Sequence, residues 1–434
     1  MLPNTATLFT EVNVLDGSGA DPYAAEVLVE GAHVTAVGQP GTTARPVGTR
    51  VVDGHGGTLM PALCDAHTHF TWNNGTSLDA LGTMPVEEHT LLAMRSARTY
   101  LDYGYTMCVG AASAKQRLDV VIRNAINAGE IPGPRYLANG KEIASTGGAL
   151  IPSISNIVDT PDEMRKTVRE MVGIGVDVVK LILSGEEITG NLRAEDTYFT
   201  DAEVAVCVEE AHRRGVRVAA HARSAESVKM CLRHGVDIIY HASYIDAEGM
   251  DELERQKDRV FVAPGLNWII ATLEDAAPWG FSPDDAERVG YKRELEVAVE
   301  GLREMHHRGI RVLPGGDYGF AWTPHGTYAR DLAHFVQLLG FTPMETILAA
   351  TAQGGEIMLR PDELGKVAPG YLADLVLVDA DPLADITVLQ DRNRLAAVMK
   401  GGEFHKEPVF HREGETEIVE PPDHPRPVET HMQP

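Results

Sequence analysis

The middle of the chain, from about residue 61 to about residue 360, alternates amphipathic helices with short aliphatic strands. One unit is "DEMRKTVREMVGIG" followed by "VDVVKLILSG", and pairs of this kind recur at least five times. This alternation predicts a parallel sheet covered by helices. It extends over about 300 residues with no GxGxxG turn after a first strand, so it favours a (β/α)8 barrel over a doubly wound sheet.

The two chain ends have a different pattern, with short alternating strands separated by Gly and Asp. We expect residues 1–60 and 365–410 to pair into one small β-sandwich, with residues 61–364 inserted between them as the barrel. Residues 411–434 are rich in Pro and Glu, and we expect them to form a tail or an arm that lies on a neighbouring subunit.

Charge and composition exclude several classes of partner. The net charge of −25 argues against nucleic acid, because binding phosphates requires clustered Lys and Arg. The N-terminus has no basic and apolar secretory leader, and no apolar run approaches the roughly 20 residues that span a bilayer. The four cysteines form no CxxC pair. We therefore expect a cytoplasmic protein with free thiols and no membrane partner.

The strand "VDVVKLILSG" carries Lys180 among apolar residues. A buried ammonium costs several kcal/mol unless it is neutralised or used. The lysine therefore lies either at the exposed end of its strand or in a site that needs its chemistry.

Polar residues of a consistent kind occur where the predicted barrel strands end. His67 and His69 are two apart in "DAHTHF", so in a strand both imidazoles point to the same face. Because the carboxyl ends of barrel strands surround one pocket, these residues should converge there. Imidazole and carboxylate donors predict a divalent-metal site, for which zinc is our first choice and manganese, cobalt or iron are alternatives. The six residues are His67, His69, Lys180, His221, His241 and Asp317.

Lys180 has a chemical role available in such a site. Burial lowers the pKa of a lysine and frees the amine. A neutral amine can add carbon dioxide to give a carbamate, an anion that could bridge two cations. We state this as a hypothesis.

These motifs resemble those of the amidohydrolase superfamily, whose members have a distorted barrel and a small flanking β-sandwich. "VVDGHGGTLMPALCDAHTHF" resembles the family's entry into its first strand, and "GKVAPGYLADLVLVDADPLADI" resembles its return into the sandwich. The resemblance covers nearly the whole chain.

The resemblance implies a binuclear metal centre. His67, His69 and Asp317 would hold one ion, His221 and His241 the other, and a carbamylated Lys180 would bridge them. Asp317 would act as general base and then general acid. We assign His241 to catalysis as well as to the metal.

Within the superfamily the chain looks closest to Xaa-Pro dipeptidases, imidazolonepropionase-like proteins, ochratoxin-type amidases, and hydrolases of phenylureas and thiocarbamates. It departs from them at Ala149, where many have histidine after "TGG", and at Arg223-Ser224, where they often read "HG". Both positions lie on the expected substrate face, so a peptidase specificity does not transfer.

Six residues beside the ligands or in the following loops are candidate substrate contacts. Arg223 could clamp a carboxylate or carbonyl, or could be paired with a loop acid. The tryptophans could line an aromatic pocket, and the histidine could be a hydrogen-bond donor. The set is Arg223, Tyr244, Asn267, Trp268, Trp322 and His325.

We expect an enzyme that cleaves a C–N bond, other than a peptide bond, in an amide, urea or carbamate of a small molecule. A dipeptidase or N-acyl amino acid hydrolase is the alternative. An aminohydrolase is disfavoured because Ser224 stands where its glutamate would lie, and a lactonase and a non-enzymatic homologue remain open. The resemblance also implies a homo-oligomer.

Overall fold

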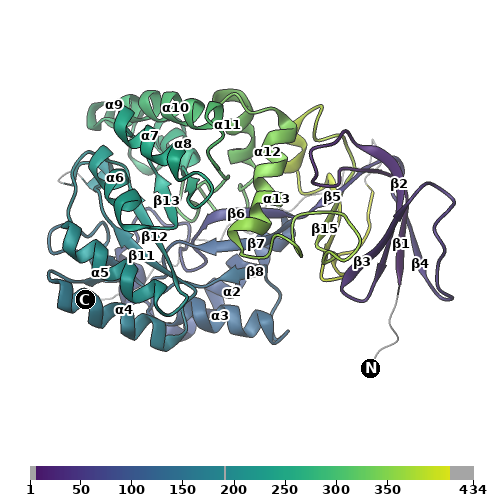
Figure 1. Cartoon of the computed structure of the whole chain (residues 1–434), viewed down its shortest axis with the longest axis horizontal. Coiled ribbons are helices and arrows are strands. Elements are labelled where there is room, and N and C mark those ends of the chain that lie inside the picture. The colour runs from purple at the N-terminus through teal and green to yellow at the C-terminus, as the bar shows by residue number, and fades with distance from the viewer. Residues whose placement is uncertain (1–5, 190–191, 411–434) are drawn as a thin grey trace.

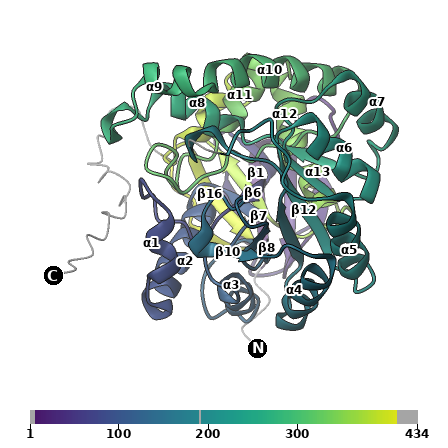
Figure 2. The same cartoon turned by 90° about the vertical axis from the view of Figure 1, so that its left-hand side faces the viewer.

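The helix–strand alternation folds into a ring of parallel strands in the computed structural model, which describes residues 6–189 and 192–410. The strands of the ring belong to two parallel sheets, one of three strands and one of six. Figure 2 looks toward this ring, with the strands inside and the helices around them. The three strands are β6 (Leu63–Thr68), β7 (Tyr105–Gly110) and β8 (Arg135–Leu137). The six are β9 (Glu142–Ala144), β10 (Ser155–Ile157), β11 (Val178–Ile182), β12 (Arg217–Ala222), β13 (Ile238–His241) and β14 (Phe261–Ala263).

Backbone hydrogen bonds close the ring where the two sheets meet. The carbonyl of Ala138, just after β8, accepts from the amides of Asp177 and Val178 at the start of β11. On the other side, Val312 forms a parallel bridge with β14, and the amide of Ala66 in β6 donates to the carbonyl of Pro314 at 3.0 Å. The chain therefore has the α/β fold of a distorted (β/α)8 barrel.

The helices surround the strands, and the sequence sets where they begin and end. Thr160 caps α4 by accepting from the amide of Glu163, and Gly175 ends it with a φ of 92°. Ser224 and Gly235 do the same for α6. Because only glycine adopts this left-handed backbone without strain, each glycine turns the chain into the following strand.

The helices are α1 (Asp79–Thr83), α2 (Val86–Asp102), α3 (Leu118–Asn127), α4 (Pro161–Ile174), α5 (Asp201–His212), α6 (Ala225–His234), α7 (Ala247–Arg255), α8 (Leu266–Glu274), α9 (Pro283–Val289), α10 (Tyr291–His307), α11 (Arg330–Leu338), α12 (Pro343–Ala350) and α13 (Ala352–Ile357). Short 3-10 helices, among them η1 (Pro152–Ile154) and η2 (Glu187–Thr189), lie in the loops.

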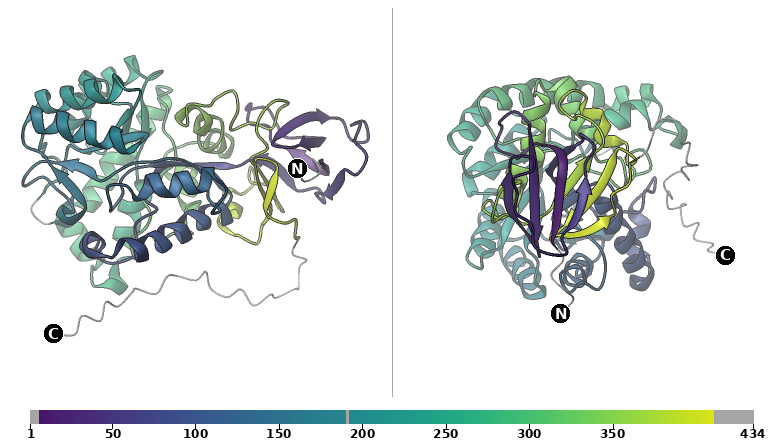
Figure 3. Two further views of the ribbon diagram at one scale, coloured as in Figure 1. Left: turned by 90° about the horizontal axis from the view of Figure 1, so that it is seen from below. Right: turned by 90° about the vertical axis from the view of Figure 1, so that its right-hand side faces the viewer.

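Both chain ends contribute to one eight-stranded sheet beside the barrel (Figures 1 and 3). Its order is β17-β16-β15-β5-β1-β2-β3, with β4 also paired to β1. The N-terminal strands are β1 (Thr7–Val14), β2 (Tyr23–Glu30), β3 (His33–Gly38), β4 (Arg50–Asp53) and β5 (Thr58–Pro61). The C-terminal strands are β15 (Leu375–Val378), β16 (Leu395–Lys400) and β17 (Glu403–Lys406).

The pairing of β5 with β15 joins the two ends and also positions the site. The two strands are antiparallel, with Pro61 opposite Leu375. One residue separates the end of β5 from the start of β6, which carries His67. The end sheet therefore holds the first barrel strand in place.

The remaining expectations concern location and the C-terminus. All four cysteines are buried free thiols. Within the described part of the chain, no helix has the length and apolar character needed to cross a membrane. The expected tail or arm at residues 411–434 lies outside the described residues.

Candidate metal centre

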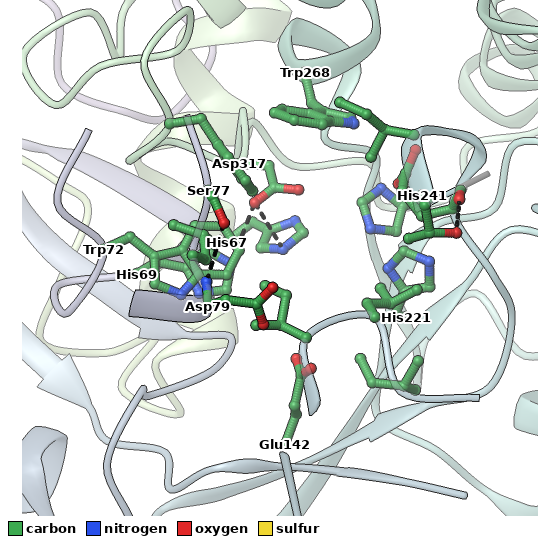
Figure 4. Close-up of a pocket in the computed structure, with 18 of the residues that line it drawn as sticks. His67, His69, Trp72, Ser77, Asp79, Glu142, His221, His241, Trp268 and Asp317 are labelled. Carbon is green, nitrogen blue, oxygen red and sulfur yellow. Dashed lines mark hydrogen bonds and ion pairs between the residues drawn. The ribbon is translucent and has the colours of Figure 1, made fainter. Parts of the chain in front are cut away.

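The six residues expected at strand ends all lie around one pocket at the carboxyl end of the barrel. Figure 4 shows His67 and His69 on one side of this pocket, His221 and His241 on the other, and Asp317 between them. His67 is in β6 and His69 follows it by one residue, whereas His221 is in β12 and His241 ends β13. The barrel therefore brings together residues that are up to 250 positions apart.

Asp317 lies close to both histidines of the first strand. Its Oδ1 atom is 3.7 Å from Nε2 of His67 and 3.2 Å from Nε2 of His69. One ligand atom each from His67, His241 and Asp317 lies within 4.8 Å of the others. The rings of His221 and His241 have centroids 4.4 Å apart. These spacings suit shared coordination of an ion by imidazole and carboxylate.

Backbone carbonyls fix the orientation of three of the imidazoles. Nδ1 of His69 donates to the carbonyl of Ala112 at 3.1 Å. Nε2 of His221 is paired with the carbonyl of Gly185 at 3.0 Å, and Nδ1 of His241 with that of Pro264 at 3.2 Å. Because a carbonyl only accepts, the paired nitrogen carries the proton and the opposite nitrogen keeps its lone pair. In metal proteins, the ring nitrogen of a histidine ligand that does not bind the metal commonly donates to such a carbonyl, and this hydrogen bond orients the ring.

Two of the site residues have an unusual backbone conformation. His241 and Asp317 adopt φ values of 73° and 62°, in the left-handed region that non-glycine residues rarely enter. Such strain persists where the surrounding structure enforces it and is concentrated at functional sites. The chain also packs closely nearby, since a Cβ at Gly315 would lie 2.8 Å from the amide nitrogen of His67.

Lys180 is the third of the five residues of β11 and is only 2% exposed, so it is not at an exposed strand end. Its Nζ atom lies 4.1 Å from the centre of the Tyr240 ring. Among the described residues, no carboxylate comes within ion-pair distance of it. Burial lowers the pKa of Lys180 to about 8, against the attraction of Glu142 and Asp317. The amine is thus easier to deprotonate than an exposed lysine.

Glu142, in β9, also lines the pocket and is nearly fully buried (Figure 4). Its Oε1 atom accepts from the hydroxyl of Ser155 at 3.0 Å. Burial raises the pKa of Glu142 to about 7, and the charge of Lys180 opposes that rise. The two groups are therefore electrostatically linked.

The protonation states suit a metal site. Burial lowers the pKa of His67, His221 and His241 well below the usual value. Although burial alone would raise the pKa of Asp317, the neighbouring His67 and His69 lower it overall. The histidines are accordingly neutral and the aspartate ionised, which are the forms that bind metal.

The cavity has a volume of about 250 Å³ and an aromatic wall opposite Glu142. Trp72 stacks on His69 with centroids 3.4 Å apart. Trp268 lies beside Trp322 and Phe320, with centroid distances of 5.4 and 4.2 Å. The wall presents flat apolar surface to a bound molecule.

Two of the six expected substrate contacts, Trp268 and Trp322, line this pocket. The expectation for Arg223 needs correction. Its side chain is fully buried, does not line the pocket, and is bound at Nη2 by Glu186 and at Nη1 by Glu294. Arg223 instead forms ion pairs with Glu186 and Glu294, in line with the alternative expectation that it pairs with a loop acid.

The other three expected contacts also lie outside the pocket lining. Tyr244 packs under Arg293, whose guanidinium is 5.5 Å from the ring centre. The side-chain oxygen of Asn267 pairs with His334 at 3.2 Å. Nε2 of His325 pairs with the carbonyl of Trp72 at 3.1 Å, so this histidine supports the loop that carries Trp72. The positions of these residues after barrel strands did not indicate that their side chains lie outside the pocket.

Several residues that line the pocket were not expected from the sequence, among them Glu186, Trp72 and Glu142. Glu186 lies four residues after the end of β11, in "LSGEE", and its place in the loop after a barrel strand was an available signal. Trp72 lies three residues after His69, in a loop whose path the sequence does not indicate. Glu142 begins a strand, and no motif marks it.

The donor set fits a divalent metal. Within the described part of the chain, Nε2 of His69, Nε2 of His241 and Oδ1 of Asp317 are buried without a hydrogen-bond partner. Buried polar atoms are normally satisfied, so several unpartnered lone pairs around one cavity fit a site that binds a cation. Neutral imidazoles and an ionised carboxylate suit zinc and neighbouring first-row metals.

Comparison with known proteins agrees with this geometry. The model of the amidohydrolase family matches residues 58–404. Ochratoxinase of Aspergillus niger is 28% identical over 81% of this chain and 76% of its own length, and its crystal structure superposes with a TM-score of 0.80. Imidazolonepropionase of Rubrobacter xylanophilus is 24% identical over 87% of this chain and 90% of its own. A crystal structure of a Xaa-Pro dipeptidase with bound methionine has a TM-score of 0.82 and 25% identity, over 93% of this chain and 100% of that one.

Proposed function

The chain belongs to the amidohydrolase family and is a hydrolase of carbon–nitrogen bonds; on that premise we propose that it cleaves an amide, urea or carbamate of a small molecule with two divalent metal ions. The observation that carries the proposal is the convergence of four neutral histidines, a buried lysine and an ionised aspartate on one aromatic-walled cavity. The family is generally metal-dependent, and we propose zinc as the metal.

The residues that would hold the ions are those around the cavity. His67, His69 and Asp317 would hold one ion, and His221 and His241 the other. When bound, such ions lower the pKa of a water molecule and polarise the scissile carbonyl.

We propose that Lys180 is carbamylated. Its neutral Nζ adds to the carbon of carbon dioxide and loses one proton, which gives an anionic carbamate. Burial in β11 favours this reaction by lowering the pKa of the amine. The product would replace a buried cation by an anion that can hold both ions.

Asp317 is the proposed proton carrier. It lines the cavity and is ionised, so it can accept the proton that the attacking water loses. It then delivers this proton to the leaving nitrogen, which departs as a neutral amine. The fixed ring of His241 keeps its acceptor nitrogen toward the same space.

The test is turnover by protein purified without chelators and loaded with zinc. Anilides, phenylureas and aryl carbamates are incubated with it, and release of the amine is measured by chromatography. Release that disappears on chelation and returns with metal supports the proposal. No release from any of the three classes, with the metal shown to be bound, contradicts it.

A second candidate is a dipeptidase or N-acyl amino acid hydrolase, which the likeness to the Xaa-Pro dipeptidase structure favours. Its substrates carry a carboxylate next to the scissile bond. Including N-acyl amino acids in the same assay separates the two candidates.

A further inference from the structure

The cavity contains carboxylates that the proposed mechanism does not use. Asp79, Glu142 and Glu186 all line it, in addition to Asp317. Among the described residues of the lining, Lys180 is the only lysine or arginine, and its amine faces Tyr240 within the metal site. Apart from bound metal ions, the side chains that line the cavity thus include more acidic groups than lysines and arginines.

Arg223, the nearest arginine in sequence to the metal ligands, is bound on two sides. Its Nη2 donates to Glu186 and its Nη1 to Glu294, and all three side chains are buried. The hydroxyl of Ser243 also donates to Glu294, at 2.7 Å. Turning Arg223 toward a substrate would leave two buried carboxylates without their cation, so it is not available to bind a substrate anion.

Glu186 is held firmly in the lining. Its Oε1 atom accepts from the hydroxyl of Tyr291, and its Oε2 atom accepts from Arg223. The cluster contains two carboxylates and one guanidinium, which gives one surplus negative charge beside the cavity when both acids are ionised. Like charges brought together in a buried site repel strongly.

We infer that Glu186 determines specificity by excluding carboxylate-bearing substrates, so that the site takes uncharged or amine-bearing aryl amides, ureas and carbamates rather than dipeptides or N-acyl amino acids. The inference rests on the proposed function for its reaction, and it narrows the substrate class of that same site. The aromatic wall of Trp72, Trp268 and Trp322 would hold the aryl group.

Two ketones test this selectivity without any turnover. The first, 1,4-diphenylbutan-1-one, is uncharged, and the second, 2-benzyl-4-oxo-4-phenylbutanoic acid, differs only by a carboxylate next to the position of the scissile nitrogen. Neither has a C–N bond. Their dissociation constants for the zinc-loaded protein are measured by titration calorimetry at pH 8. Burial raises the pKa of Glu186 to about 7, so its carboxyl group is ionised at this pH.

We expect the uncharged ketone to bind at least about tenfold more tightly than the acid, because like-charge contact opposes the latter. Glu186→Gln keeps the shape of the side chain and removes its negative charge. It should therefore reduce the ratio between the dissociation constants of the acid and the uncharged ketone at least about threefold. Glu187→Gln is the matched control, because Glu187 is the neighbouring residue but does not line the cavity. It should leave the ratio unchanged.

Equal or tighter binding of the acid by the unaltered protein would overturn the inference. An unchanged ratio in Glu186→Gln would remove Glu186 as its cause. Because both ligands lack a scissile bond, these outcomes are independent of the turnover assay. Absence of amine release would contradict the proposed reaction and leave the binding result to decide the selectivity.

Discussion

The Nζ atom of Lys180 lies 4.1 Å from the centre of the Tyr240 ring, and the same ring stacks on His67 with centroids 4.0 Å apart. Tyr240 therefore contacts both the lysine of β11 and the first histidine of the site. Among the described residues no carboxylate lies within ion-pair distance of Lys180, so its nitrogen is available for reaction.

Replacing Lys180 by Ala should deplete the protein of at least one metal ion. It should also reduce kcat/KM by about 100-fold, because the variant loses a group that organises the metal site. Short carboxylic acids should restore part of the activity by taking the place of the carbamate. Elemental analysis and the amine-release assay measure both effects. Lys166→Ala, at an exposed helix position, is the control. Unchanged metal content in the Lys180 variant would rule out a bridging role.

Asp317→Asn should retain part of the metal and lose about 100- to 10,000-fold in kcat, the usual range for removal of a general acid–base group. The asparagine keeps the shape of the side chain but cannot carry the proton. Steady-state kinetics of zinc-loaded protein measure the effect, with Asp284→Asn as an exposed control. Full activity of the Asp317 variant would show that another group transfers the proton.

The convergence of most of the proposed metal residues on one pocket could be predicted from the sequence, because their positions follow a rule. His67 and His69 are two apart on a strand, and His221, His241 and Asp317 lie at the ends of strands that the barrel brings together. The direction of side chains in the loops follows no such rule. Arg223 lies one residue after β12, yet it turns to bind Glu294, which is 71 positions away in the sequence.

Glu142 and Trp72 are the converse case, since they belong to the pocket although the sequence did not indicate it. Both line the cavity, but their places depend on how the loop after β6 and the short strand β9 pack against the barrel. Long-range packing of this kind leaves no local pattern in the sequence. The fold class was accessible because hydrophobic periodicity is local, and the similar pattern of the two chain ends predicted that they pair. Which strands join them, β5 with β15, and in what register, was not predictable.

Arg223→Met should destabilise the protein by about 3–5 kcal/mol, the usual effect of breaking a buried ion pair from one side. The substitution leaves Glu186 and Glu294 buried without their shared cation. Chemical denaturation followed by fluorescence measures the change in the free energy of unfolding. Arg293→Met removes an exposed arginine paired with Glu195, and should change it by less than about 1 kcal/mol. Equal effects of the two substitutions would contradict the account of this cluster.

Acid should destabilise the metal-free protein partly through His325. Burial lowers the pKa of His325 to about 4, while the unfolded chain has the ordinary value near 6.5. Between these two values only the unfolded state takes up the proton, so this stabilisation is complete above about pH 6.5 and is lost as the pH falls toward 4.

In this pH window His325→Gln should reduce the dependence of the unfolding free energy on pH by about 1.4 kcal/mol per pH unit, the value of one proton. Denaturation of the metal-free protein at pH 5 and pH 6.5 provides the comparison. Tyr328→Phe removes the hydroxyl next to His325 but no group that titrates in acid, so it should leave the slope unchanged. An unaltered slope in the His325 variant would mean that this histidine is protonated in the folded state.

The central claim is that four histidines, Asp317 and a carbamylated Lys180 hold a pair of metal ions. The most direct test is the metal content per chain, by elemental analysis of protein purified without chelators and then incubated with zinc and bicarbonate. The account predicts about two ions per chain, falling to one or none in Lys180→Ala. A content near zero that persists with zinc, manganese or cobalt would contradict it.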